Sequence, residues 1–286
     1  MRFRKSTISR ASNFGPRFIR CASGAFFESA KRCAFVLILA LTGISCAEAR
    51  TIRVMSYNIH VGFGMDKKLD LARIAAVIKR ERADIVGLQE VDRGVERTGR
   101  VDQIAELARL TGMDYAFAPN LRYQGGWYGV AILSRFPITS FEHRRYRNRR
   151  EAERRGFIRA EISIDDLRLQ FVTTHLDYQF ADGRLFEAEQ LLRALNPIRD
   201  PLIVAGDFND EPTGQTYAIM RAALADAWID GRTAPTNGFT FPADEPVKRI
   251  DYIFYRGSDR LRIGRAWVVE TLASDHRPVV VEFELH

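Results

Sequence analysis

Short apolar runs that end in polar side chains recur along the chain, and residues 202–209, LIVAGDFN, are the clearest of them. The first five residues of this run carry no charge and no side-chain hydrogen-bonding group, which predicts a short strand buried on both faces. Asp207 and Asn209 follow at its carboxyl end. Side chains two residues apart in an extended chain point the same way, so this carboxylate and amide are expected to share one target. Taken alone, the run is equally consistent with a polar Asx turn closed by Pro212.

Similar runs predict further strands at residues 54–60, 84–90, 115–119, 128–134, 157–163, 169–175 and 249–255, with a last one after residue 276. Several of them end in an acid, an amide or an imidazole; these residues are Asn58, Glu90, His175, Asp251, Asp275 and His276. Asp251 lies inside an otherwise apolar and aromatic strand, and because an unpaired buried carboxylate is costly, it is expected to have a partner. Taken singly, Glu90 could instead begin a solvated loop, and His175 could be a hydrogen-bonded structural residue.

Helices are predicted where apolar residues repeat at helical spacing. Asp70 caps the first, and the second runs from Asp102 to Gly112, which is placed to end it as a C-cap. A third lies around residues 185–195, and a short fourth follows Pro212. Alternation of strand and helix at the start, followed by strand after strand, predicts mixed sheets packed on each other with helices outside.

The first 49 residues have the composition of a targeting segment. A basic stretch ending at Arg32 is followed by the apolar run AFVLILAL at residues 34–41 and by an A-x-A pattern at residues 47–49. We expect an export signal, with the mature chain in the periplasm or outside the cell. The apolar run is shorter than the roughly 20 residues of a spanning helix, although an uncleaved leader would leave the protein tethered to a membrane. No internal repeat or linker divides residues 50–286, which are expected to form one domain.

The net charge of +7 does not identify a nucleic-acid-binding protein. Residues 1–49 hold eight basic residues against two acidic ones, so they carry +6 of the total and the rest of the chain carries +1. All three cysteines, Cys21, Cys33 and Cys46, also lie in this leader. The expected mature chain therefore has no thiol for a disulfide, a cysteine nucleophile or a cysteine-ligated zinc. Cys46 suggests a lipid anchor, but Gly43 stands where a large aliphatic residue would be expected.

Seven arginines occur between residues 144 and 155, in the segment HRRYRNRREAERRG. Most charge runs are solvated loops, and that interpretation stays open. The functional alternative is a basic flap that grips an anionic substrate. In either case the arginines are expected to stay out of the core, and their mutual repulsion is expected to keep the loop extended unless anions bind it. The candidates for substrate binding are Arg144, Arg145, Arg147 and Arg149.

The polar residues at the strand ends form an oxygen-rich, thiol-free donor set. Ligand sites in layered α/β proteins collect outside strand ends, so these residues are expected to converge. Carboxylates and amides suit a hard cation such as Mg²⁺, or Mn²⁺ in its place. Zinc bound by His60, His175 and His276 is the alternative, but these histidines lack the helical spacing of a zinc motif.

A divalent cation with acids, amides and two imidazoles favours hydrolysis of a phosphoester. The metal polarises a phosphoryl oxygen, a carboxylate accepts a proton from water, and an imidazole meets charge on the transferred group. No GxSxG elbow or P-loop in the sequence competes with this interpretation.

Six short motifs in this order resemble the endonuclease/exonuclease/phosphatase superfamily; they are SYN at 56–58, LQE at 88–90, TH at 174–175, GDFN at 206–209, IDY at 250–252 and SDH at 274–276. The resemblance covers nearly all of the chain after residue 49. It implies a four-layer αββα sandwich, with two mixed β-sheets packed face to face and helices outside, and a Mg²⁺-dependent phosphoesterase. The loops that would contact substrate fall outside the motifs and set specificity.

The resemblance also implies roles for the matched residues. Glu90 is implied as the chief metal ligand, with Asn58 and Asp275 beside it. Whether one ion or two would bind is not fixed by these motifs, because both schemes share the same residues.

The implied catalytic residues lie on the other motifs. Asp207 orients or deprotonates water, and Asn209 supports the phosphate. His276 contacts the phosphate and is oriented by Asp251, which would supply the partner that a buried Asp251 requires. His175 is implied as the second imidazole.

The substrate is less constrained than the chemistry. The resemblance implies phosphodiesters such as DNA or RNA, phosphoinositides and sphingomyelin. An extracellular nuclease is expected to have a basic groove along the phosphate backbone, and a charge of +1 outside the leader gives no such global field. We therefore expect a monomer that acts on a lipid headgroup or a small phosphodiester, with membrane lipid as a partner. A secreted nuclease and an inactive binding relative are the alternatives.

Overall fold

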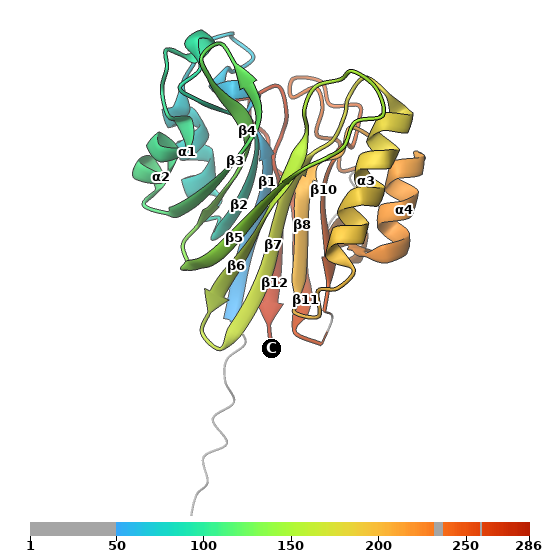
Figure 1. Ribbon diagram of the computed structural model, residues 1–286. Coiled ribbons are helices and arrows are strands. Elements are labelled where there is room, and N and C mark those ends of the chain that lie inside the picture. The colour runs from blue at the N-terminus through green and yellow to red at the C-terminus, as the bar shows by residue number, and fades with distance from the viewer. Residues whose placement is uncertain (1–49, 232–236, 258) are drawn as a thin grey trace, which may run out of the picture. The chain divides into compact units, whose positions relative to one another are not determined.

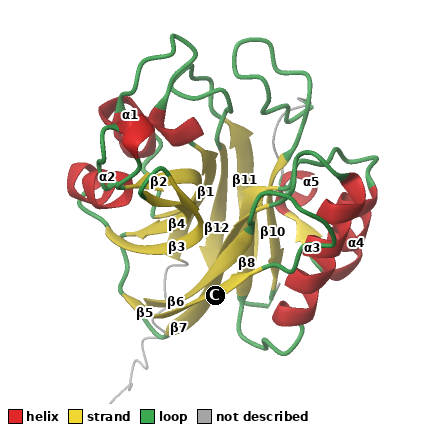
Figure 2. Cartoon of the chain, turned by 45° about the horizontal axis from the view of Figure 1, so that its top comes forward, coloured by secondary structure: helices red, strands yellow, loops and turns green. Residues whose placement is uncertain are grey.

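Two β-sheets lie face to face at the centre of the computed structural model, and helices cover both outer faces (Figure 1, Figure 2). The structure describes residues 50–231, 237–257 and 259–286. The predicted leader at residues 1–49 lies outside the described residues. The layers run helix, sheet, sheet, helix, which confirms the predicted four-layer αββα sandwich.

The first sheet has six strands in the order β11-β12-β1-β2-β4-β3. β1 and β2 are parallel and the other neighbours are antiparallel, so this sheet is mixed, as predicted. The strand bounds are β1 Arg50–Asn58, β2 Ile85–Arg93, β3 Asp114–Tyr123, β4 Gly126–Ser134, β11 Leu261–Val268 and β12 Val279–Leu285.

The second sheet also has six strands, in the order β5-β6-β7-β8-β10-β9. Here β7 and β8 form the parallel pair, and the buried run at 202–209 supplies β8. The strand bounds are β5 Ile138–Arg145, β6 Gly156–Ile164, β7 Leu167–His175, β8 Leu202–Asp207, β9 Ala225–Asp226 and β10 Asp251–Arg256.

Apolar side chains fill three layers of core. Between the sheets, Ile85 and Phe283 of the first sheet lie in one cluster with Phe171 and Ile203 of the second, all fully buried. A second cluster joins α1 and α2 to the outer face of the first sheet, and a third joins α3 and α4 to the second sheet. The helix bounds are η1 His60–Gly62, α1 Leu71–Arg80, η2 Glu96–Thr98, α2 Gln103–Thr111, α3 Ala181–Leu195, α4 Gln215–Ala223 and α5 Ala227–Asp230.

The predicted helix caps are confirmed. Asp70 accepts a hydrogen bond from the backbone N–H of Arg73, and Asp102 accepts one from the N–H of Ala105. Gly112 ends α2 in the left-handed conformation, with φ 69°, which glycine adopts without steric cost. No helix within the described ranges combines the length and apolar character needed to span a bilayer.

β5 and β11 have no counterpart among the predicted strands. Both are edge strands, so each is paired on one side only and carries exposed residues where a central strand would be apolar. Arg144 and Arg145 therefore lie in a strand, which corrects the prediction that a loop begins at residue 144. An edge position accommodates these charges because their side chains reach solvent.

Candidate active site

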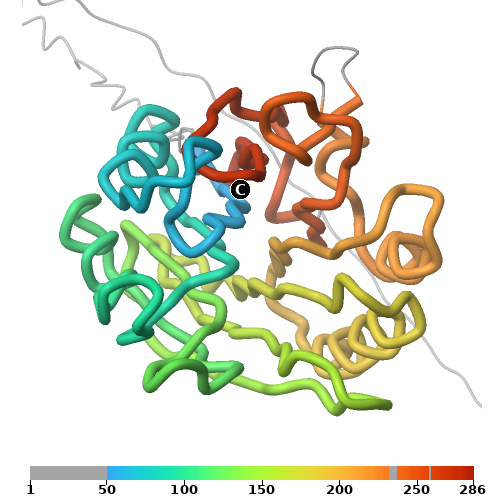
Figure 3. Tube along the Cα trace, turned by 90° about the horizontal axis from the view of Figure 1, so that it is seen from above, coloured from blue at the N-terminus to red at the C-terminus, as the bar shows by residue number. Residues whose placement is uncertain are grey.

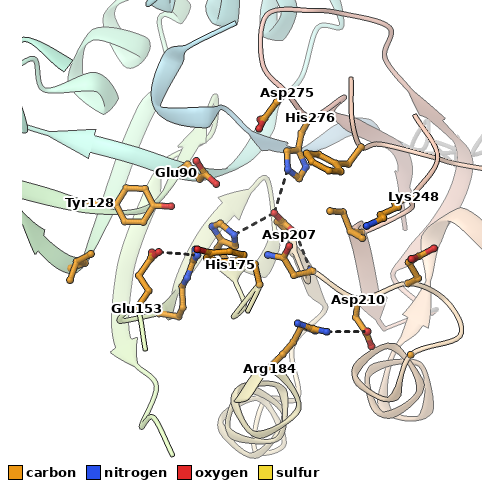
Figure 4. Close-up of a pocket in the computed structure, with 18 of the residues that line it drawn as sticks. Glu90, Tyr128, Glu153, His175, Arg184, Asp207, Asp210, Lys248, Asp275 and His276 are labelled. Atoms are coloured by element: carbon orange, nitrogen blue, oxygen red, sulfur yellow. Dashed lines mark hydrogen bonds and ion pairs between the residues drawn. The ribbon is translucent and has the colours of Figure 1, made fainter. Parts of the chain in front are cut away.

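Figure 3 looks down on the end of the molecule where strand ends of the two sheets meet. A pocket of about 870 Å³ opens there (Figure 4). Its described lining includes Glu90 from the first sheet, His175 and Asp207 from the second, and Asp275 and His276 from the segment before β12. Asn209 also lines the pocket, and Asn58 and Asp251 lie buried behind it. The predicted convergence of the strand-end residues is therefore what the structure shows.

Asp207 is at the centre of the site and is 1% exposed. Its Oδ1 accepts a hydrogen bond from the backbone N–H of Asn209 at 2.9 Å, and its Oδ2 accepts one from Nδ2 of Asn58 at 3.0 Å. Burial, together with the nearby carboxylate of Asp251, raises the pKa of Asp207 to about 7. A carboxyl group with such a pKa is a stronger proton acceptor than an exposed aspartate.

His276 is the partner that the sequence analysis required for the buried Asp251. The two residues share a hydrogen bond of 2.9 Å between His276 Nδ1 and Asp251 Oδ2, and the free Nε2 lies 3.8 Å from Oδ2 of Asp207. The pairing of β8 with β10 sets Asp251 directly opposite Asp207. Burial disfavours the charged imidazole, but the carboxylates of Asp251 and Asp207 outweigh it and raise the pKa of His276 to about 10. His276 is therefore a cation at neutral pH.

His175 provides a second imidazole with a different charge. Its Nε2 lies 3.4 Å from Oδ2 of Asp207, at the end of β7. Burial, helped by the positive charges of Arg155 and His276, lowers its pKa well below the ordinary value. The two histidines therefore flank one carboxylate, one neutral and the other charged.

Glu90 is held in the pocket by an irregularity in β2. The register with β4 shifts between Leu88 and Val91, and Glu90 adopts a left-handed backbone with φ 57°. A non-glycine residue in this conformation stores strain and is typical of functional sites, and a β-bulge re-aims the side chain. Nδ2 of Asn58 donates to Glu90 Oε1 at 3.1 Å, so the same amide bridges Glu90 and Asp207.

Asp275 lines the same pocket as Glu90, and in Figure 4 both residues lie above Asp207. Its Oδ1 accepts a hydrogen bond from Ser274 Oγ at 3.3 Å, and its Oδ2 lies 3.7 Å from Nδ1 of His60. Ser274 also donates to the backbone oxygen of Asn58 at 2.8 Å. These contacts tie the segment before β12 to the end of β1.

The carboxylates facing the pocket fit a hard divalent cation. Glu90 and Asp275 both offer carboxylate oxygens to the pocket, and no cysteine occurs among the described residues. Asn58 directs its amide nitrogen at Glu90, and its Oδ1 accepts from the backbone N–H of His60 at 3.1 Å. In this orientation Asn58 positions Glu90, and its role as a direct ligand stays a prediction.

A second group of potential ligands lies deeper. Atoms of Asp207, Asp251 and His276 lie within 4.8 Å of one another. Their mutual contacts already account for this proximity, since His276 Nδ1 is hydrogen-bonded to Asp251. A metal position on the Glu90 side of the pocket stays a prediction.

Arg155 also lines the pocket, and sequence reasoning did not single it out. It is 3% exposed, which corrects the expectation that all seven arginines stay out of the core. Strand pairing places Arg155 here, because Gly156 at the start of β6 pairs with His175. The residue before Gly156 is thereby carried to the same end of the sheet.

The four arginines predicted to bind substrate lie elsewhere. Arg144, Arg145 and Arg147 line a separate pocket against α3, and Arg149 lies over the ring of Phe186 at 4.4 Å. Arg150 pairs with Asp182, so the loop folds against α3 instead of extending, and that expectation is wrong. Arg144 pairs with nearby Glu142, whereas the contacts of Arg149 and Arg150 with α3 are distant in sequence and could not be read from the charge run. A substrate role for these four arginines stays a prediction.

Comparison with known proteins identifies relatives of the whole described region. Residues 55–276 match the model of a family described as the Endonuclease/Exonuclease/phosphatase family. An Escherichia coli K12 protein named "Uncharacterized protein YbhP" is 28% identical over 252 residues, which cover 82% of this chain and 97% of that protein.

Two further proteins have informative names. A Caenorhabditis elegans protein named "Putative neutral sphingomyelinase" is 28% identical over 218 residues, covering 63% of this chain and 46% of that protein. The solved structure of a Bacteroides thetaiotaomicron protein described as a mannosyl-6-phosphatase has a TM-score of 0.68 and 21% identity, covering 81% of this chain and 99% of that one. At this identity the structural likeness shows a shared fold.

Proposed function

Because the chain belongs to the endonuclease/exonuclease/phosphatase family, we propose that it hydrolyses phosphoester bonds with a divalent cation, Mg²⁺ or Mn²⁺, as cofactor. The observation that carries this proposal is the arrangement around Asp207. A buried carboxylate with a raised pKa lies between a neutral and a protonated imidazole, beside two carboxylates that face the pocket.

The proposed roles follow from the charge states. Asp207, with a pKa of about 7, accepts the proton of the attacking water. His276 directs Nε2–H toward an anionic phosphoryl oxygen, and Asp251 holds both its ring orientation and its charge. His175 stays neutral and supports Asp207 from the other side. A cation held by Glu90 and Asp275 would neutralise developing negative charge on the transferred group.

Arg155 adds a fixed positive charge to the wall beside His175. Guanidinium groups bind phosphate oxygens in a fork geometry, so we assign Arg155 to the phosphate of the substrate. Asn209 supports the site indirectly, since its Nδ2 donates to the backbone oxygen of Leu176 at 3.1 Å while its N–H holds Asp207.

We propose a lipid headgroup or a small phosphodiester as the substrate of a monomeric, exported enzyme. The pocket of about 870 Å³ is large enough for a headgroup, and one relative is named as a putative neutral sphingomyelinase. The near-zero charge outside the leader argues against a nuclease that depends on a broad basic surface. The apolar leader supports a place in the periplasm or outside the cell, tethered to the membrane if the leader is retained.

The first experiment measures hydrolysis of bis-p-nitrophenyl phosphate and of p-nitrophenyl phosphate with Mg²⁺, with Mn²⁺ and with EDTA. Metal-dependent turnover that is lost in Asp207→Asn supports the proposal. If the folded protein hydrolyses neither these compounds nor any natural phosphoester with metal present, it is not a phosphoesterase.

A second experiment separates the substrates. The protein is incubated with sphingomyelin vesicles, phosphoinositide vesicles, plasmid DNA and RNA, and products are quantified. We expect release of a lipid headgroup. Efficient degradation of the plasmid with inert lipids would establish the nuclease alternative instead.

A further inference from the structure

Arg155 is buried without enough hydrogen-bond partners. Its Nη2 donates to Glu153 Oε2 at 3.2 Å, while Nε and Nη1 are buried and have no hydrogen-bond partner in the described part of the chain. Unsatisfied donors of a buried guanidinium cost free energy, and the contacts of Arg155 with the described residues leave two of its nitrogens unsatisfied. The residue also lines the pocket.

Arg97 lines the same pocket, and a carboxylate satisfies its hydrogen-bond donors. Its Nε and Nη2 donate to the two carboxylate oxygens of fully buried Asp92 at 2.8 and 2.9 Å. This bidentate pair is the arrangement expected of a structural ion pair. The contact between Arg155 and Glu153 is single and longer, so it does not saturate either group.

Glu153 is also incompletely satisfied. Its Oε1 is buried and has no hydrogen-bond partner among the described residues, although 29% of the side chain is exposed. Glu153 and Glu90 both line the pocket, and Glu153 lies below Tyr128 in Figure 4. The ion pair with Arg155 holds the Glu153 carboxylate there.

We propose that the Glu153 carboxylate occupies the phosphate position of Arg155 and that the substrate phosphate displaces it. Glu153 is thus an intramolecular competitor carried by the arginine-rich loop. A phosphate offers several oxygens to the guanidinium fork, whereas Glu153 engages one nitrogen, so exchange lets Arg155 make more hydrogen bonds. The inference rests on the proposed function, because it assumes that the ligand of this pocket is a phosphoester.

The loop that carries Glu153 is anchored away from this side chain. Asn148 Nδ2 donates to the backbone oxygens of Ala152 and Glu153, and the N–H of Tyr146 donates to the oxygen of Arg155. These bonds hold the backbone, while within the described residues the Glu153 carboxylate is hydrogen-bonded to Arg155 alone. Displacement therefore requires a side-chain rotation and leaves the backbone in place.

The test is calorimetric titration of inorganic phosphate into the full-length protein, with Mg²⁺ present and again after chelation. Glu153→Gln should bind phosphate roughly fivefold more tightly than the wild-type protein, since one competing charge has been removed. Glu153→Ala should also bind phosphate more tightly than the wild-type protein, which would exclude a hydrogen bond from the new glutamine as the cause. Arg155→Met should lose the binding measured after chelation.

Glu211→Gln is the matched control, because Glu211 lines the same pocket and loses the same charge without touching Arg155. It should change phosphate affinity by less than about twofold. If Glu153→Gln and Glu153→Ala bind phosphate no more tightly than Glu211→Gln, or more weakly than the wild-type protein, Glu153 orients Arg155 and the inference is wrong.

Kinetics give a second readout. The Michaelis constant for a chromogenic diester should fall in Glu153→Gln with kcat unchanged, whereas an orienting role for Glu153 would raise it. The phosphate titration needs no turnover. Failure of the proposed function, seen as absence of hydrolysis, is therefore distinguishable from failure of this inference, seen as unaltered phosphate affinity.

Discussion

The buried carboxyl group of Glu187 allows a quantitative test of how burial of an acid changes the free energy of unfolding with pH. This residue of α3 is 3% exposed, and its Oε2 accepts a hydrogen bond from the backbone N–H of Asp177 at 2.7 Å. Burial is the largest effect on the group and raises its pKa from 4.5 to about 8. The folded protein therefore holds Glu187 in its neutral form near pH 7.

The magnitude follows from proton linkage. A pKa of about 8 in the folded state against 4.5 in the unfolded state corresponds to about 5 kcal/mol, at about 1.4 kcal/mol for each pH unit. Because the folded state binds the proton more tightly, this contribution is fully present below pH 4.5 and is lost as the pH rises through about 8. The carboxylate form destabilises the fold.

The perturbation is Glu187→Gln, which keeps a hydrogen-bond acceptor for Asp177 and cannot ionise. Urea denaturation at about pH 5 and about pH 9 should show similar free energies of unfolding for both proteins at the lower pH. At the higher pH the variant should be more stable by several kcal/mol.

Glu189→Gln is the control, since this acid lies on the same helix with 40% of its side chain exposed. It should follow the wild-type protein at both pH values. If Glu187→Gln and the wild-type protein lose the same stability between the two pH values, the argument from burial is refuted.

Three further predictions concern the site and the arginines. Asp251→Asn removes the carboxylate that orients His276 and keeps it charged, so turnover of a chromogenic diester should fall about 10²-fold or more. Mg²⁺ affinity measured by calorimetry should not change. Near wild-type turnover would contradict this role of Asp251. Asn58→Ala should weaken Mg²⁺ binding about tenfold, because its amide orients Glu90, and unchanged affinity in the same titration would exclude that function. Charge reversal of four arginines outside the main pocket should leave kcat and KM for the small diester unchanged; they are Arg144, Arg145, Arg147 and Arg149. A loss of that activity would show that the lining of the main pocket has been misassigned.

The sequence predicted the layers and most elements because these depend on local patterns. The buried run at 202–209, the caps Asp70 and Asp102, and the glycine end of α2 each have a cause within a few residues. The requirement that buried Asp251 have a partner was also sound, and His276 is that partner. The edge strand β5 carries no such pattern, since most of its residues are exposed or half-buried.

The features that the sequence missed depend on long-range pairing. Nothing near Glu90 indicates the register shift against β4 that gives it φ 57°. Arg155 looks like its six neighbours in the charge run, yet pairing of β6 with β7 buries it beside His175. The partners of Arg145 and Arg150 lie on β3 and α3, far away in sequence.

The central claim is that Glu90 holds the metal and His276 acts on the phosphate. The most direct measurement is the Mg²⁺ dependence of diester hydrolysis in the wild-type protein, Glu90→Gln and His276→Ala, with Mg²⁺ affinity measured by calorimetry on the same samples. We expect Glu90→Gln to raise the Mg²⁺ concentration for half-maximal rate, and His276→Ala to leave Mg²⁺ affinity intact and lower kcat at saturating metal. Equal losses of Mg²⁺ affinity in both variants, with full rate restored by saturating Mg²⁺, would contradict it.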